Sequence, residues 1–197
     1  MCINIETSIF AFLTGIISGY LLINKNNKIE YRQIGKFIIF YSFVQLFEAC
    51  IYFYGDNASS IFSQLILINV SFHGLILFLL ISKIIDINYY YLYIFIFISS
   101  YISYYALSNN FNNASINKCI KWEFLNNDII TYLLYVMYIL ILYKMLTSDN
   151  KLLIIFALIY IITSIISINS YNCSPGLWCL YSALIAPLFV ILNNLLE

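Results

Sequence analysis

Residues 37–55 read FIIFYSFVQLFEACIYFYG, and this apolar run predicts a membrane-spanning helix that carries one acid, Glu48. An ionisable side chain inside a bilayer is costly and is by default a candidate functional residue with a partner to be found. Four polar side chains recur along this run at spacings of four, three and four residues: Tyr41, Gln45, Glu48 and Tyr52. These spacings align side chains on one helix face, so we expect a polar row that faces other protein rather than lipid.

The composition excludes a water-soluble globular protein. Of the 197 residues, 63% are hydrophobic and only 9% are charged, whereas soluble domains carry about 25% charged residues. Each helical crossing needs about 20 apolar residues, so seven crossings would use about 140 residues and leave only short loops. We therefore predict an all-α integral membrane protein whose whole chain, residues 1–197, forms one seven-helix bundle.

The apolar runs set the predicted helix boundaries, and polar stretches separate them. The link at 24–36 is polar and basic, and Gly55, Asp56 and Asn57 are turn formers that should close the second helix. Pro187 is expected to kink the last helix. The predicted spans are about 8–23, 37–55, 61–82, 89–107, 128–146, 151–168 and 175–196.

Small residues mark one face of the first predicted helix. They form two adjacent pairs four residues apart, Thr14 with Gly15 and Ser18 with Gly19. Small side chains let two helices approach closely in lipid, so we expect this helix to pack tightly against a neighbour.

The basic residues predict the orientation of the chain in the membrane. With seven spans, one side of the membrane receives seven basic residues and the other receives Lys118 and Lys121. Cytoplasmic loops carry the excess of Lys and Arg, so the N-terminus should be outside and the C-terminus cytoplasmic. The seven are Lys25, Lys28, Arg32, Lys36, Lys83, Lys144 and Lys151.

Polar groups from several predicted helices could meet in the outer half of the bundle. Counted from the predicted helix ends, Glu48 lies about seven residues deep, Asn69 about eight and His73 about twelve, at about 1.5 Å per residue. These groups could form an outward-facing ligand pocket, or could hydrogen-bond one another and clamp the helices together. The candidate pocket residues are Gln45, Glu48, Tyr52, Asn69, His73, Trp122, Glu123, Trp178 and Ser182.

Cys119 and Cys173 lie in predicted outer loops beside the helices that begin near residues 128 and 175. An oxidising outer compartment would permit a disulfide between them, which requires Cα atoms within about 7 Å. Free thiols are the alternative.

Several chemistries fit the residue inventory poorly. A hydrolytic zinc site typically uses two or three histidines, and the chain has one, His73. Every lysine lies at a predicted helix end or in a loop, which excludes a retinal-type pigment with its mid-membrane Schiff base. A triad of His73, Ser182 and Glu48 would need a geometry that sequence cannot supply. We find no phosphate loop and no nucleic-acid signature, so neither a cofactor nor a nucleic-acid partner is expected.

Four patches of sequence resemble an uncharacterised seven-helix family, a domain of unknown function found in bacteria and large DNA viruses. They are the run from Asn172 to Ser182 (NCSPGLWCLYS), the pair Trp122-Glu123, the opening Met1-Cys2, and the second-helix pattern ending in Tyr52 and Asp56. The resemblance implies seven helices and supplies no activity. The chain is also rich in Ile, Asn, Lys, Tyr and Phe and has a single arginine, Arg32, a composition typical of an A+T-rich genome. Together with the resemblance, this composition suggests a viral source, and thus a viral or host membrane.

This chain departs from the family pattern at two polar pairs. It has Gln45 then Glu48 where the family has Glu then Gln, and Asn69 then His73 where the family has His then Gln. Such an exchange suits a hydrogen-bond network or a tolerant binding pocket better than an acid catalyst of fixed geometry.

The sequence favours a non-enzymatic multi-pass membrane protein that binds, senses or transports a small polar ligand. The alternatives are an intramembrane enzyme acting on lipid, with Glu48 and His73 as acid and base, and a purely structural or partner-binding membrane protein. The lipid bilayer is the expected partner in each case, and the oligomeric state is left open.

Overall fold

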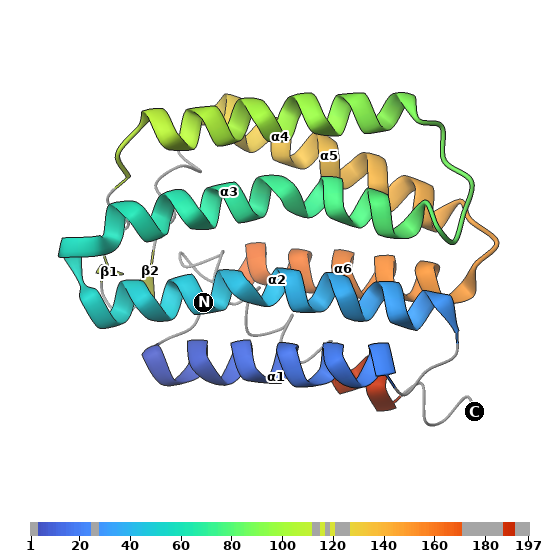
Figure 1. The fold of residues 1–197 in the computed structure, drawn as a ribbon, viewed down its shortest axis with the longest axis horizontal. Coiled ribbons are helices and arrows are strands. Elements are labelled where there is room, and N and C mark those ends of the chain that lie inside the picture. Colours follow the sequence, from blue (N-terminus) through green and yellow to red (C-terminus); the bar gives the residue numbers. More distant parts are fainter. Residues whose placement is uncertain are drawn as a thin grey trace.

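The central helix of the molecule is α2 (Ile29–Tyr54), which contacts helices on two of its sides (Figure 1). The computed structural model describes residues 4–24, 28–111, 115–116, 119–120, 127–170 and 187–191. In these ranges the secondary structure is helical apart from two short strands.

The first four helices pack in chain order, each antiparallel to the next (Figure 1). They are α1 (Ile5–Asn24), α2, α3 (Asp56–Ile81) and α4 (Tyr90–Ser108). α5 (Asp128–Leu146) packs against α3, α4 and α6 (Lys151–Ser170). Between α4 and α5, strands β1 (Ser115–Ile116) and β2 (Cys119–Ile120) pair antiparallel, with Ser115 opposite Ile120.

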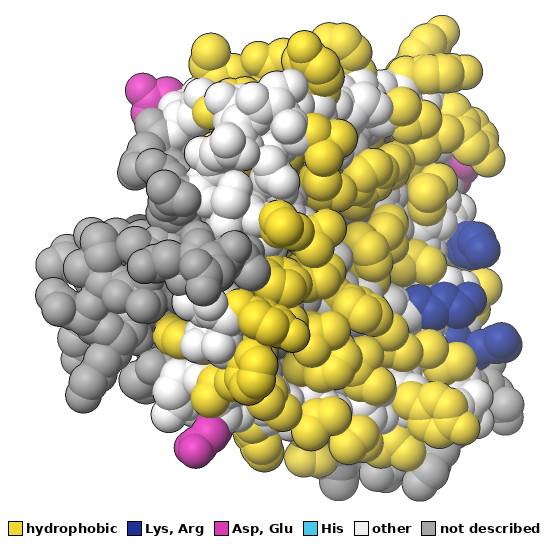
Figure 2. Space-filling view, turned by 60° about the vertical axis from the view of Figure 1, so that its left-hand side comes forward, with side chains coloured by type: hydrophobic (Ala, Val, Ile, Leu, Met, Phe, Trp, Pro, Cys, Tyr) yellow, Lys and Arg dark blue, Asp and Glu magenta, His cyan; other side chains and the backbone are white. Residues whose placement is uncertain are grey.

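The described helices form a membrane bundle. Five of them, α1 to α5, are long and apolar enough to cross a bilayer, and a shorter apolar stretch, Lys151–Ile162, begins α6. Large apolar side chains are exposed on each of the six helices, and they cover much of the face drawn in Figure 2. This arrangement identifies an integral multi-pass membrane protein, because such a surface is compatible with lipid and not with water. Residues 187–191 are helical, and a seventh span remains a prediction.

Two predicted boundaries are corrected by the structure. α2 begins at Ile29 rather than at residue 37, and α3 begins at Asp56 rather than at residue 61. The charged side chains of the predicted link do not end the helix, because long basic side chains at a helix end can extend toward the headgroups. Only Gly55 separates α2 from α3, with φ 60° and ψ −149°, a backbone conformation that is essentially restricted to glycine.

The small residues of α1 lie against α2, as predicted. A Cβ atom added to Gly19 would lie 2.7 Å from the Gly35 carbonyl oxygen, and one added to Gly35 would lie 2.7 Å from the Gly19 carbonyl oxygen. The two backbones therefore touch at this crossing. Gly15 lies against the Ser42 side chain, whose hydroxyl donates to the Ile38 carbonyl at 2.7 Å. Close backbone approach is the packing that small residues permit in membranes.

The basic residues gather at one end of the bundle, beside the apolar surface (Figure 2). This end contains the start of α2, the end of α3, the end of α5 and the start of α6. The described basic residues here are Lys28, Arg32, Lys36, Lys83, Lys144 and Lys151. The charge count assumed that these residues lie on one side of the membrane, and their position at one end of the bundle agrees with that assumption. The orientation of the bundle in the membrane remains a prediction.

Candidate functional site

The polar row of α2 is buried inside the bundle. Glu48 is 1% exposed and Gln45 is 2% exposed, Tyr41 is also buried, and Tyr52 is half-buried against the core. Phe37, at the start of the same face, packs edge-on against Phe156 of α6. The prediction that Glu48 faces protein rather than lipid is confirmed.

His73 of α3 forms the centre of a second buried polar group, which we call the His73 centre and define as His73, Asn69 and Tyr138. The His73 side chain is 0% exposed. Its Nε2 atom lies 2.7 Å from Asn69 Oδ1, one turn earlier on α3, and its Nδ1 atom lies 3.0 Å from the Tyr138 hydroxyl of α5. Both ring nitrogens are thus engaged by protein.

One tautomer satisfies both ring nitrogens of His73. A neutral ring that carries its proton on Nε2 donates to Asn69 Oδ1, and its Nδ1 accepts from the Tyr138 hydroxyl. This assignment takes the Asn69 amide with its oxygen toward the ring. A fully hydrogen-bonded polar group is tolerated in an apolar interior, whereas an unbonded one is expensive.

Aromatic rings enclose the His73 centre. The ring centroids of Phe37, Phe40 and Tyr41 lie 5.9, 5.6 and 4.9 Å from that of His73. On the far side, Tyr138 stacks on Tyr160 of α6 with 5.6 Å between centroids. Side chains of α2 and α5 therefore contact His73 of α3, and α6 joins the group through the Tyr138–Tyr160 contact.

Glu48 and His73 lie at different levels of the bundle. Tyr41 contacts the His73 ring and so marks its level on α2. Glu48 is seven residues farther along α2, which corresponds to about 10 Å toward the α2–α3 turn. Because α3 begins at Asp56, His73 is also farther from the start of its helix than the expected twelve residues. A direct acid–base pair between these two side chains does not fit this spacing.

Several predicted site residues lie outside the described part of the chain, so their placement stays a prediction. They are Trp122, Glu123, Trp178, Ser182 and Cys173. Cys119 is described as a backbone position in β2. Among the described side chains, Cys50 of α2 is a free thiol.

Sequence reasoning missed the tyrosines that complete the His73 centre. Tyr138 and Tyr160 belong to a set of 19 tyrosines, so no spacing singled them out. It also missed a serine contact between α3 and α4, in which the Ser99 hydroxyl donates to the Ser71 carbonyl at 2.7 Å. A weak signal existed, because hydroxyl side chains recur as hydrogen-bonding groups between membrane helices.

Metal ligands do not cluster in the described region, where no group of three His, Cys, Asp or Glu side chains comes together.

No family model matches the chain, and neither a curated protein nor a solved structure matches it.

Proposed function

We propose that this multi-pass membrane protein binds a small polar ligand beside Gln45 and Glu48. The observation that carries the proposal is the burial of the Glu48 carboxyl group, 1% exposed, in a helix able to span the bilayer. An ionisable side chain inside a membrane-spanning helix is costly on insertion scales. Such a residue is by default part of a functional site.

The residue types favour a ligand that carries a positive charge or several hydrogen-bond donors. A carboxylate accepts hydrogen bonds and attracts cations, and the Gln45 amide, 2% exposed, can both donate and accept. A small amine or a monovalent cation fits this pair. Glu48 is seven residues from Gly55, so we propose that the ligand enters from the end of the bundle where α2 turns into α3.

A second candidate is a purely structural role for the buried polar residues. It is favoured by the His73 centre, where both ring nitrogens already have protein partners. The lipid-modifying enzyme is less well supported, because Glu48 lies about 10 Å along α2 from Tyr41, the residue that contacts the His73 ring. We place the ligand-binding proposal at Gln45 and Glu48, nearer the α2–α3 turn than the His73 centre, and assign a structural role to Asn69 and His73.

Chemical modification of Glu48 tests the proposal. Dicyclohexylcarbodiimide reacts with protonated carboxyl groups in apolar surroundings, and mass spectrometry of the modified peptide locates the product. We expect Glu48 to be modified in isolated membranes, and small amines or monovalent cations to slow the modification. Glu30 is the internal comparison. It lies at the basic end and accepts from Asn150 Nδ2 at 3.0 Å, and we expect neither modification by the carbodiimide nor an effect of amines or cations there.

The Glu48→Gln variant should give no product at this position. If amines and cations across a broad panel leave the rate at Glu48 unchanged, the ligand-binding proposal is wrong and the structural role stands. Membership in the seven-helix family, a seventh span and a viral source are also part of our proposal, and they rest on the sequence patches that resemble that family.

A further inference from the structure

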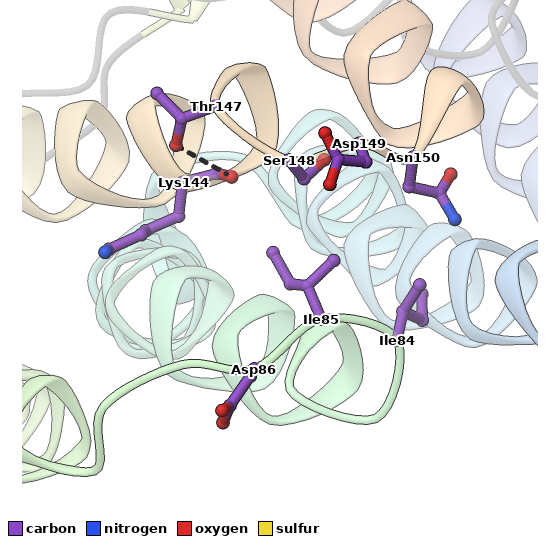
Figure 3. A pocket seen from close by; sticks show the side chains of 8 residues that line it. All are labelled: Ile84, Ile85, Asp86, Lys144, Thr147, Ser148, Asp149 and Asn150. Atoms are coloured by element: carbon purple, nitrogen blue, oxygen red, sulfur yellow. Dashed lines mark hydrogen bonds between the residues drawn. The ribbon is translucent and has the colours of Figure 1, made fainter.

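A polar pocket lies at the basic end of the bundle, away from Glu48 and the His73 centre. It has a volume of about 550 Å³ and lies between the connection that follows α3 and the turn from α5 to α6. We call it the interface pocket, and its polar lining comes mainly from Lys144 and the turn residues Thr147, Ser148, Asp149 and Asn150 (Figure 3).

The α5–α6 turn is held in place by its own hydrogen bonds. Asn150 Oδ1 accepts from the backbone N–H groups of Leu152 and Leu153, and Asn150 Nδ2 donates to Glu30 Oε1 of α2 at 3.0 Å. The Ser148 hydroxyl donates to the Met145 carbonyl at 2.7 Å. The pocket wall is therefore preformed, which lowers the entropic cost of binding.

Lys144 and Asp149 line the same pocket without pairing with each other. Among the described residues, neither makes an ion pair, and the Lys144 ammonium lies 5.2 Å from the centroid of the Tyr91 ring. Figure 3 shows Lys144 extending away from the turn that carries Asp149, and Asp86 pointing away from that turn. The pocket lining thus holds one cationic group, Lys144, and two anionic groups, Asp86 and Asp149, at separate places.

The position of the pocket indicates where its ligand comes from. It lies at the ends of α3 and α5, two helices able to span the bilayer, and so at the depth of the lipid headgroups. Ile84 and Ile85 supply apolar lining beside the charged groups. A ligand with charged and apolar parts that lies at this depth is a membrane lipid.

We propose that the interface pocket binds the zwitterionic headgroup of a phospholipid, with the phosphate near Lys144 and the ammonium near Asp149. A purely anionic headgroup fits less well, because the pocket lining has two carboxylates, Asp86 and Asp149, and a single cation. This inference uses different residues from the Glu48 proposal and does not depend on it.

Native mass spectrometry of the purified full chain can test the proposal with added phosphatidylethanolamine or phosphatidylglycerol. We expect the parent protein to retain phosphatidylethanolamine in preference. Lys144→Gln and Asp149→Asn should each weaken that retention by about tenfold, because each removes one charge-assisted contact. Lys144→Arg should preserve it. Lys83→Gln, which changes an exposed lysine outside the lining at the same end, is the matched control and should have no effect.

Three outcomes would overturn the proposal. Equal retention of both lipids would show that the pocket does not select a zwitterion. Equal losses in Lys83→Gln and Lys144→Gln would reveal general attraction by the basic end. Displacement by soluble phosphoethanolamine, without selectivity among lipids, would assign the pocket to a soluble zwitterion and exclude the lipid source.

Discussion

The two faces of α2 are packed in opposite ways. The face toward α1 includes the small residues Gly35 and Ser42, and at Gly19 and Gly35 the two backbones touch. The face toward α3 and α6 carries Phe37, Tyr41, Gln45 and Glu48, and its contacts are made by large and polar side chains. At the Gly19–Gly35 crossing the first face leaves no space for a ligand, so a site at this level would use the second face.

The largest effect is expected at the glycine face. Gly35→Leu places a side chain where a Cβ alone would lie 2.7 Å from the Gly19 carbonyl oxygen and 2.9 Å from Leu22 Cβ. Overpacking typically costs about 1–3 kcal/mol, and a backbone neighbour cannot turn aside, so we expect a loss of at least about 3 kcal/mol in unfolding free energy. Denaturant titration in detergent micelles, followed by circular dichroism, measures it.

Gly74→Ala is the matched control for the glycine face. Its added Cβ would meet Met137 Cβ and Sδ at 3.3 Å. The flexible thioether end can turn aside, and the contact with Met137 Cβ needs a shift of only a few tenths of an ångström. We expect a change below about 1 kcal/mol. If Gly35→Leu were as mild as Gly74→Ala, the close backbone contact between α1 and α2 would be wrong.

The next effect is expected at the His73 centre on the opposite face. His73→Leu removes the partner of Asn69 Oδ1 and of the Tyr138 hydroxyl, and each buried group left unbonded costs about 1–3 kcal/mol. We therefore predict a loss of about 2–4 kcal/mol in unfolding free energy. A double-mutant cycle with Tyr138→Phe should show a coupling of about 1 kcal/mol. Additive losses would mean that these two side chains do not interact.

Helix identity and the inward side of α2 could be predicted from sequence, because both depend on local periodicity. Glu48 had to be buried, since its spacing from Gln45 and Tyr52 puts all three on one face. The early start of α2 could not be predicted from hydropathy, because Arg32 and Lys36 look like loop residues unless their side chains can reach the headgroups.

The partners of the polar groups depend on tertiary packing and could not be predicted. His73 meets Tyr138 across 65 positions of sequence, and nothing local distinguishes that tyrosine from its neighbours. The interface pocket could not be predicted from the sequence for the same reason. Lys144 and Asp149 resemble ordinary charged residues at a helix end, and only the fold places the α3–α4 connection opposite them.

A smaller effect is expected at Glu48. Glu48→Gln should preserve stability, because an amide can reproduce much of the hydrogen bonding of a carboxyl group. Glu48→Leu should lower the unfolding free energy by about 1–3 kcal/mol through groups left unsatisfied. The same micelle titration compares the two variants. A leucine variant as stable as the parent would mean that Glu48 does not contribute to folding stability. A role of Glu48 would then depend on the carbodiimide experiment alone.

The smallest effect, of opposite sign, is expected at Gln33 in the first turns of α2. Its side chain is 6% exposed, and within the described structure its Oε1 atom accepts no hydrogen bond. A buried acceptor without a donor is destabilising, so Gln33→Leu should raise the unfolding free energy by about 1 kcal/mol. Gln33→Glu is the comparison and should destabilise, because a charge there would be harder still to bury. A loss of stability in the leucine variant would mean that the Gln33 amide is hydrogen-bonded, as the ring nitrogens of His73 are on the neighbouring helix.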